Sequence, residues 1–176
     1  YRFGFTGTLD GTQTHKWVLE GLFGPSYKVT QTKKLIEQGH LSQLDIQCVV
    51  LKYKPQKFDT YEDEIQFLIG NEKRNKFLCN LALDLKGNTL MLYSRVETHG
   101  KVLYEMINKN VTHGRKVFFI HGGVDAEDRE SVRKITEEEN NAIIVASYGT
   151  FSTGINIKNL HNVIFASPSK SRIRNL

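Results

Sequence analysis

The stretch AIIVASYGTFSTGINIKNLHNVIFASPSKS, residues 142–171, decides which fold we expect for this chain. It contains two apolar runs, 142–147 and 162–166, which are separated by a loop rich in Gly, Ser and Thr. Uninterrupted apolar runs bounded by turn residues are typical of the central strands of a parallel sheet. Because ligands of such sheets bind on the loops that follow the strands, the loop 148–154 is the first place to look for a site.

The first of these runs is followed by small and hydrogen-bonding side chains. With the last residue of the run, they are Ser147, Thr150, Ser152, Thr153, Gly154 and Asn156. Hydroxyls and backbone amides of this kind suit phosphate oxygens. The loop is therefore a candidate phosphate-binding loop, although composition alone favours a polar surface connection that binds nothing.

Upstream of this stretch the pattern alternates between strands and helices. We expect strands at 89–93 and 116–120 and helices at 98–108 and 125–138, the last with Val132 and Ile135 facing inward. Alternation with short loops predicts βαβ units. The predicted fold class is therefore α/β, a parallel sheet with helices on both faces.

The first half of the chain gives weaker signals. We expect a strand, two helices and a second strand, in that order, at residues 1–8, 13–22, 33–38 and 45–53. Thr60 and Asp63 then form a capping-box pattern. The clearest helical periodicity follows, an apolar stripe made of Phe77, Leu78, Leu81, Ala82 and Leu85.

Composition restricts the class of protein only broadly. The chain has 24 Lys and Arg against 19 acidic residues, and this excess is compatible with nucleic acid without demanding it. No apolar run approaches the roughly 20 residues that a membrane span needs, so we expect no membrane partner. Cys48 and Cys79 are too far apart for a CxxC pair, which favours a reduced intracellular setting. The opening YRFGFTGTL, without an initiator Met, indicates a piece of a longer protein.

Several catalytic signatures are absent from the sequence. It contains no GxxxxGK[ST] phosphate loop, no acidic pair after an apolar strand, no HExxH and no GxSxG. Its six histidines never take metal-ligand spacing, so we expect no metal site. No GxGxxG follows a strand, which counts against a Rossmann-type small-molecule domain. We expect no catalytic residue in this chain by itself.

Four segments, in their order and spacing, resemble superfamily 2 helicases. They are GFTGTLDGT (4–12), TLMLYSRVETHGKVLYEMI (89–107), VFFIHGG (117–123) and the stretch quoted above. The resemblance implies a RecA-like fold, with residues 1–26 ending a first RecA-like domain and residues 27–176 forming most of a second. The second domain would carry motifs IV and V and stop before motif VI. The family couples ATP hydrolysis to translocation on DNA and remodels branched DNA.

The resemblance also implies roles for particular residues. Thr6-Gly7-Thr8 matches motif III, which links the nucleotide state to nucleic acid; a strand end and turn is the alternative. Ser94 and Arg95 match motif IV and would offer a hydroxyl and a charge to a phosphate, although Ser94 could instead cap a helix. His121-Gly122 matches the His-Gly after the next strand, where glycine lets the backbone approach nucleic acid, or simply forms a turn.

Motif V supplies the remaining candidates. Ser147 and Thr150 would contact the DNA backbone, and Gly154 and Asn156 would touch the nucleotide. Many relatives carry Asp in place of Asn156, whereas Swi2/Snf2-type translocases share the Gly-Ile-Asn sequence. Arg129 is better explained as a structural residue that pairs with a carboxylate.

The implied partners and cofactors follow from the family. ATP and Mg²⁺ would be bound mainly by the first RecA-like domain. DNA, whether branched, single-stranded or forked, would be held mostly by its phosphate backbone, and RNA is possible. Because the lysine, metal ligands and arginine that phosphoryl transfer needs are absent, we expect this chain alone to be inactive. A Snf2-like duplex translocase and a non-enzymatic nucleic-acid-binding α/β module remain the alternatives.

Overall fold

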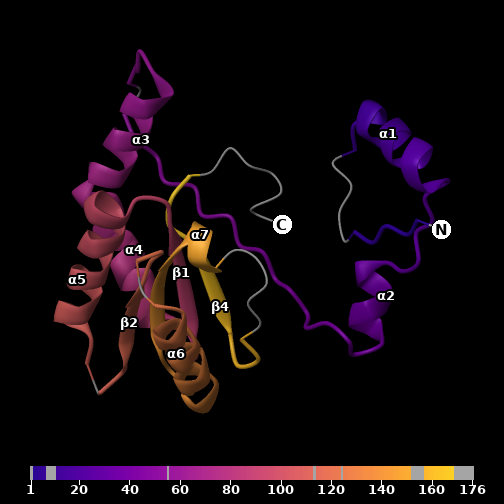
Figure 1. Ribbon diagram of the computed structural model, residues 1–176. Helices are drawn as coiled ribbons and strands as arrows, with labels where there is room; N and C mark the ends of the chain where they lie inside the picture. Colours follow the sequence, from indigo (N-terminus) through magenta and orange to yellow (C-terminus); the bar gives the residue numbers. More distant parts are fainter. Residues whose placement is uncertain are drawn as a thin grey trace. The chain divides into compact units, whose positions relative to one another are not determined.

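The computed structural model of the chain describes residues 2–6, 11–54, 56–112, 114–123, 125–151 and 157–168, without the side chains of residues 126, 128, 129 and 151. The chain divides into two compact units, Tyr1–Val50 and Leu51–Leu176 (Figure 1). The first unit contains helices and extended chain, and the second contains the sheet.

Two helices form in the first unit, close to the predicted bounds. They are α1 (Gln13–Phe23) and α2 (Thr32–Glu37). Gly24 directly follows α1 with a φ angle of 84°, and Gly39 lies just beyond α2 with a φ angle of 74°. Both angles lie in the left-handed region that glycine adopts without strain, so these two residues end the helices.

The strands predicted at 1–8 and 45–53 do not form in the described residues 2–6 and 45–53. The side chains of residues 45–50 are all exposed. β-branched and aromatic residues favour an extended chain, but a strand forms only where a neighbouring strand supplies hydrogen-bond partners. The predictions were wrong because the composition of a segment does not report whether such a neighbour exists.

The second unit alternates helices and strands much as predicted. Its elements, in chain order, are α3 (Tyr61–Gly70), α4 (Glu72–Asp84), β1 (Thr89–Tyr93), the π-helix η1 (Val96–Gly100), α5 (Lys101–Asn110), β2 (Val117–Ile120), α6 (Ala126–Glu138), β3 (Ile143–Ser147), α7 (Tyr148–Phe151) and β4 (Asn162–Phe165). The predicted capping box begins α3. The Thr60 hydroxyl accepts from the Asp63 N–H at 3.1 Å, and the Asp63 carboxylate accepts from the Thr60 N–H at 3.1 Å.

The four strands of the described residues form one parallel sheet in the order β2-β3-β1-β4. Every residue of β1 and β3 is buried, as expected for central strands. β4 lies at the edge of this sheet, where Val163 and Phe165 are 46% and 51% exposed. The prediction that residues 162–166 form a central strand is therefore wrong. An apolar run shows that a strand is covered in part, but not how many strands flank it.

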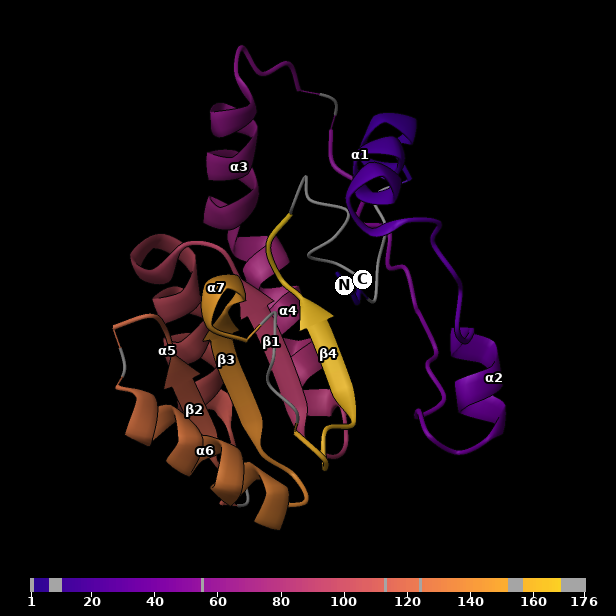
Figure 2. The same ribbon diagram turned by 45° about the vertical axis from the view of Figure 1, so that its right-hand side comes forward.

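Helices cover both faces of the sheet, which confirms that part of the prediction (Figures 1 and 2). One face packs against α4 and α5 through a core that includes Leu78, Met91, Tyr93, Leu103, Ile107 and Val145. The other face packs against α6 through a core that includes Leu90, Leu92, Val132, Ile144 and Ala146. The alternation of side chains along each strand thus divides the core into two layers.

Helix α6 is turned differently from the prediction. Val132 packs against the core as expected, but Ile135 is 37% exposed. Thr136 is fully buried in its place, and its hydroxyl donates to the carbonyl oxygen of Val132 at 2.7 Å. Because this bond satisfies the hydroxyl within the helix, a polar residue can occupy the inward position that we assigned to Ile135.

The segment after β1 begins with η1 rather than with an α-helix at Thr98. Gly100 ends η1 and lies against the buried ring of Tyr93. A Cβ atom at this position would lie 2.4 Å from two ring carbons of Tyr93. Glycine is therefore needed at position 100 for η1 to pack on the sheet.

Candidate nucleic-acid interface at the C-terminal edge of the sheet

The carboxyl ends of all four strands meet at one edge of the sheet, because the strands are parallel (Figure 2). The residues that directly follow or end the strands lie along this edge in the order of the strands. From β2 to β4 they are His121, Ser147, Ser94 and Ala166. The fold therefore gathers the motif IV and motif V candidates at the same edge from segments up to about 50 residues apart in sequence.

Ser94 and Arg95 leave β1 at the surface. Ser94 is exposed, and its N–H donates to Ser167 Oγ at 3.0 Å. Arg95, and not Ser94, is the N-terminal cap residue of η1, so the alternative that Ser94 caps this helix is wrong. Arg95 Nη2 donates to both carboxylate oxygens of Glu62 on α3, each at 2.6 Å. The motif IV charge is thus present at the edge and is paired with a carboxylate.

His121 and Gly122 follow β2. His121 Nδ1 accepts from the N–H of Gly123 at 3.1 Å, and its ring lies 5.4 Å from the ring of Phe119. Because Nδ1 accepts, a neutral ring carries its proton on Nε2. Gly122 is exposed, and a Cβ there would meet nothing within 4 Å. The packing of the described residues therefore does not require glycine at position 122.

Ser147 and Thr150 end β3 and form the first turn of α7, where we predicted a loop. Their hydroxyl oxygens lie 2.7 Å apart, and the two residues are only 9% and 7% exposed. Gly149 between them is exposed. The two hydroxyls bond to each other across the turn rather than lying open at the surface. A contact between either hydroxyl and a ligand would have to open this bond.

Some of the predicted residues lie outside the described part of the chain. They are Gly7, Thr8, Gly154 and Asn156, together with the side chain of Arg129. Thr6 is described, and it is exposed in the first unit. The roles assigned to motif III and to the second half of motif V therefore stay predictions.

A buried polar network, which the sequence did not lead us to expect, joins this edge to the core. Ser167 Oγ, which accepts from Ser94, also lies 2.9 Å from His99 Nδ1. His99 Nε2 lies 3.3 Å from Asn75 Oδ1, and Asn75 Nδ2 donates to the carbonyl oxygen of Ile69 at 2.7 Å. The side chains of Asn75, His99 and Ser167 are all buried. The network therefore runs from α4 through η1 to the residues that follow β4 and β1.

The direction of each bond in this network follows from the donors available. Asn75 donates through its amide nitrogen, so its Oδ1 accepts the proton on His99 Nε2, and His99 Nδ1 accepts from the Ser167 hydroxyl. Only a neutral imidazole allows this pattern. Burial, together with the charge of Arg74, lowers the pKa of His99 to about 4. The ring is therefore neutral at physiological pH.

Two further bonds hold the chain where it leaves β4. Arg74 Nη2 donates to the carbonyl oxygen of Ala166, and the Tyr148 hydroxyl donates to the carbonyl oxygen of Ser167 at 3.0 Å. Burial raises the pKa of Tyr148 to about 12, so its hydroxyl keeps the proton that it donates. Among the described residues, Arg74 Nη1 is buried without a hydrogen-bond partner. One of its two terminal nitrogens thus bonds to the chain at the C-terminal edge, and the other has no partner in the described part of the chain.

The sequence held some signals for this network. Asn75 lies three and seven residues before Leu78 and Ala82, on the apolar face of the predicted helix. A polar residue on such a face usually has a buried partner. Ser167 closely follows an apolar strand, as Ser94 and Ser147 follow or end theirs. The partners themselves could not be named, because they are up to 73 residues apart in sequence.

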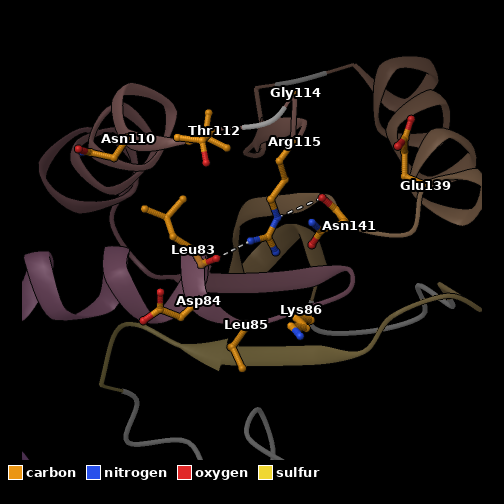
Figure 3. Close-up of a pocket in the computed structure, with 11 residues that line it drawn as sticks. Leu83, Asp84, Leu85, Lys86, Asn110, Thr112, Gly114, Arg115, Glu139 and Asn141 are labelled. Atoms are coloured by element: carbon orange, nitrogen blue, oxygen red, sulfur yellow. Dashed lines mark hydrogen bonds between the residues drawn. The ribbon is translucent and has the colours of Figure 1, made fainter.

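A pocket of about 580 Å³ lies at the opposite edge of the sheet (Figure 3). Arg115 enters it from the segment before β2, and its guanidinium donates to the carbonyl oxygens of Ala82, Leu83 and Asn141, each at 3.0 Å. It also donates to the carbonyl oxygen of Gly87 at 3.2 Å. The donors of Arg115 are therefore used by the chain itself, where they satisfy carbonyl groups at the end of α4.

No group of three or more His, Cys, Asp or Glu is placed to hold a metal ion in the part of the chain that the structure describes. No helix among those residues is both long and apolar enough to cross a membrane.

A parallel sheet with helices on both faces and a polar C-terminal edge defines the class, an α/β domain with a candidate binding edge, and comparison with known proteins identifies the family. Residues 73–176 match the helicase conserved C-terminal domain. The chain belongs to this helicase family. This finding confirms the resemblance to superfamily 2 helicases and the RecA-like fold.

Within this family, the chain is similar to one characterised helicase in both sequence and structure. The chain is 36% identical over 181 residues to the ATP-dependent DNA helicase UvsW of Enterobacteria phage T4, covering 98% of this chain and 35% of that protein. The crystal structure of T4 UvsW matches with a TM-score of 0.58 and 37% identity, over 68% of this chain and 24% of that chain. The particular similarity to the T-even phage UvsW helicase, which the motif V sequence indicated, is thus confirmed.

A more distant relative comes from a different virus. A protein of Acanthamoeba polyphaga mimivirus, named as an ATP-dependent RNA helicase, is 25% identical over 183 residues, covering 97% of this chain and 33% of that protein. The chain thus spans about a third of the length of the curated relatives that it matches.

Proposed function

We propose that this chain is part of an ATP-dependent DNA helicase that unwinds or remodels branched DNA in recombination, repair and replication restart. The observation that carries the proposal is the position of the motif candidates. Ser94, Arg95, His121, Gly122 and Ser147 all lie at the C-terminal edge of one parallel sheet in a domain of the helicase family.

The proposed motor has two RecA-like domains, of which this chain supplies parts. Residues 1–26, with Thr6-Gly7-Thr8 as the coupling segment, would end the first domain, and residues 27–176 would form most of the second. Residues 27–50 belong to the first compact unit of the structure. The proposed boundary after residue 26 therefore rests on the order of the helicase motifs and not on the division into compact units. ATP and Mg²⁺ would be bound mainly by the first domain, with Gly154 and Asn156 touching the nucleotide from the second.

DNA would bind at the C-terminal edge mainly through its phosphates. Arg95 would supply charge, and Ser94 and His121 Nε2 would supply hydrogen-bond donors at the surface. Gly122, which packing leaves free, would let the strand approach the backbone. The hydroxyls of Ser147 and Thr150 would reach a phosphate when their mutual bond opens. Such contacts carry no base information, so we expect binding that is insensitive to sequence and sensitive to salt.

The substrate could also be RNA, because the mimivirus relative is named as an RNA helicase. The T4 relative is named as a DNA helicase and is the more similar of the two, so we favour DNA. Its phage origin also supports the cytoplasm of a phage-infected bacterial cell as the place of action.

The test uses the full-length protein. ATP hydrolysis is measured without nucleic acid and with forked DNA, single-stranded DNA, blunt duplex and single-stranded RNA, and strand displacement is measured on forked and blunt substrates. We expect stimulation by DNA and displacement on forks. ATPase stimulated by duplex without displacement would identify a Snf2-like translocase instead. Stimulation by RNA but not DNA would make the protein an RNA helicase, and no stimulation by either would end the motor proposal.

A further inference from the structure

Ser167, to which the helicase resemblance gives no role, contacts two of the three segments that carry the nucleic-acid candidates. Its hydroxyl accepts from the N–H of Ser94 at 3.0 Å, at the end of β1. Its carbonyl oxygen accepts from the hydroxyl of Tyr148 at 3.0 Å, at the start of α7. Ser94 lies next to Arg95, and Tyr148 lies between Ser147 and Thr150.

The position of Ser167 is itself determined by the core. The neutral ring of His99 accepts from the Ser167 hydroxyl at 2.9 Å, and Asn75 accepts from the other ring nitrogen at 3.3 Å. Arg74, on the same helix as Asn75, donates to the carbonyl oxygen of Ala166. Helix α4 therefore holds Ala166 directly and Ser167 through His99, and these bonds fix the orientation of the Ser167 side chain.

We propose that Ser167 is a positioning residue for nucleic-acid binding, which orients the Ser94–Arg95 segment through its hydroxyl and the Tyr148–Phe151 turn through its carbonyl oxygen. The inference rests on the proposed function, since it concerns the same interface. Ser167 is 5% exposed and does not touch the ligand. It acts by keeping two segments of the C-terminal edge at a constant separation, so that both can contact one sugar–phosphate strand.

The first experiment measures binding of the full-length Ser167→Ala variant to a fluorescent single-stranded oligonucleotide over a range of salt concentrations. Loss of one hydrogen bond corresponds to a change of about fivefold in Kd. If the Arg95 contact is lost with it, the slope of log K against log salt falls by about 0.7, the value for one phosphate of a single strand. A residue that only supports the fold would lower the unfolding temperature without changing this slope.

A matched control comes from the other end of β4. Asn162 Nδ2 donates to the carbonyl oxygen of Lys86 at 2.8 Å, far from the C-terminal edge along the same strand. Asn162→Ala removes this bond and a second one to Thr89 Oγ1 at 3.3 Å, and we expect a lower unfolding temperature with unchanged Kd and salt slope.

Two further variants test each arm of the proposal. Tyr148→Phe removes the bond to the Ser167 carbonyl but keeps the ring, which stacks at 6.3 Å on Phe165. We expect it to weaken binding several-fold while leaving the salt slope unchanged. In the double variant of Ser167→Ala with Arg95→Ala, the loss of binding free energy should be less than the sum of the two single losses, because Ser167 acts in part through Arg95.

The outcomes separate this inference from the proposed function. If wild-type protein binds DNA and Ser167→Ala binds equally well, or if its effect adds fully to that of Arg95→Ala, Ser167 is not a positioning residue and only this inference fails. If wild-type protein binds no nucleic acid at all, both proposals fail together.

Discussion

Arg95 Nη2 lies 2.6 Å from each carboxylate oxygen of Glu62, so the positive charge of motif IV is paired with a carboxylate of the same chain. Glu62 belongs to the first turn of α3 and also accepts from Gln66 at 3.0 Å. Both partners of the ion pair are partly exposed, with 40% and 54% of their side-chain surface open to solvent. A phosphate that binds Arg95 must therefore compete with this carboxylate.

Glu62→Gln should strengthen nucleic-acid binding. An exposed ion pair contributes up to about 1 kcal/mol, so removing the competitor should lower Kd by roughly threefold in about 0.1 M salt. Fluorescence anisotropy with a single-stranded oligonucleotide measures this. Glu64→Gln on the same helix removes an equal charge at an exposed position away from Arg95 and serves as the control. Equal tightening by both variants would show a general charge effect and no specific role for Glu62.

Thr150→Ala should lower DNA-stimulated ATPase and unwinding while the fold stays intact. It deletes one partner of the 2.7 Å bond to Ser147, whose loss costs about 1 kcal/mol at a buried site. Thr150→Ser keeps the hydroxyl and should retain most of the activity. Unwinding rates on a forked substrate and circular dichroism together separate function from folding. Unchanged unwinding by the alanine variant would remove Thr150 from the interface.

Stability should fall as the pH drops from 7 to 5 because of His99. The folded pKa of about 4 lies below the ordinary value of 6.5, so the unfolded chain binds a proton in this range that the folded chain does not. The stability that neutral His99 provides is present above pH 6.5 and is lost toward pH 4. Between pH 7 and pH 5 we expect a loss of about 2 kcal/mol.

Chemical denaturation of wild type and His99→Gln at both pH values measures this contribution, since the difference between the two proteins cancels the effect of the carboxylates. The wild type should lose its advantage over the variant as the pH falls. A constant difference between the two proteins would contradict a depressed pKa for His99.

Gly100→Ala should destabilise the second unit strongly. The added methyl group would lie 2.4 Å from two carbons of the fully buried Tyr93 ring, whose hydroxyl donates to the carbonyl oxygen of Ile120 at 3.0 Å. Overpacking of this kind costs about 3 kcal/mol. Gly70→Ala, where a Cβ would meet nothing within 4 Å, should leave the unfolding temperature nearly unchanged. Similar melting curves for both variants would mean that η1 can move away from Tyr93.

The sequence was most informative where a local pattern and the fold agree. The capping box at Thr60 and Asp63 formed as predicted, because it needs only residues three apart. The strand 89–93 was predicted to the residue, because its apolar run is covered on both faces. For β4 a similar apolar run led us to predict a central strand, but β4 lies at the edge of the sheet. Strand pairing across the sheet, which the run does not report, determines which strand lies there.

The interface shows the same division between local and distant information. Motif order placed Ser94, Arg95 and His121 at strand ends, and the structure brings those ends to one edge. Motif order did not predict that Glu62 would pair with Arg95, since 33 residues separate them. Nor did it predict that Ser147 and Thr150 would bond to each other, because we expected a loop where α7 forms.

The amino-acid sequence by itself determined the parallel sheet, the helicase family and, apart from η1 and α7, the order of strands and helices from residue 60 onward. These follow from local hydrophobic periodicity and from short motifs in a characteristic order. Only the tertiary structure decided that the sheet order is β2-β3-β1-β4 and that Asn75, His99 and Ser167 form one buried network. The physical reason is that a buried polar side chain must find a partner. Which partner it finds depends on how segments distant in the sequence pack together.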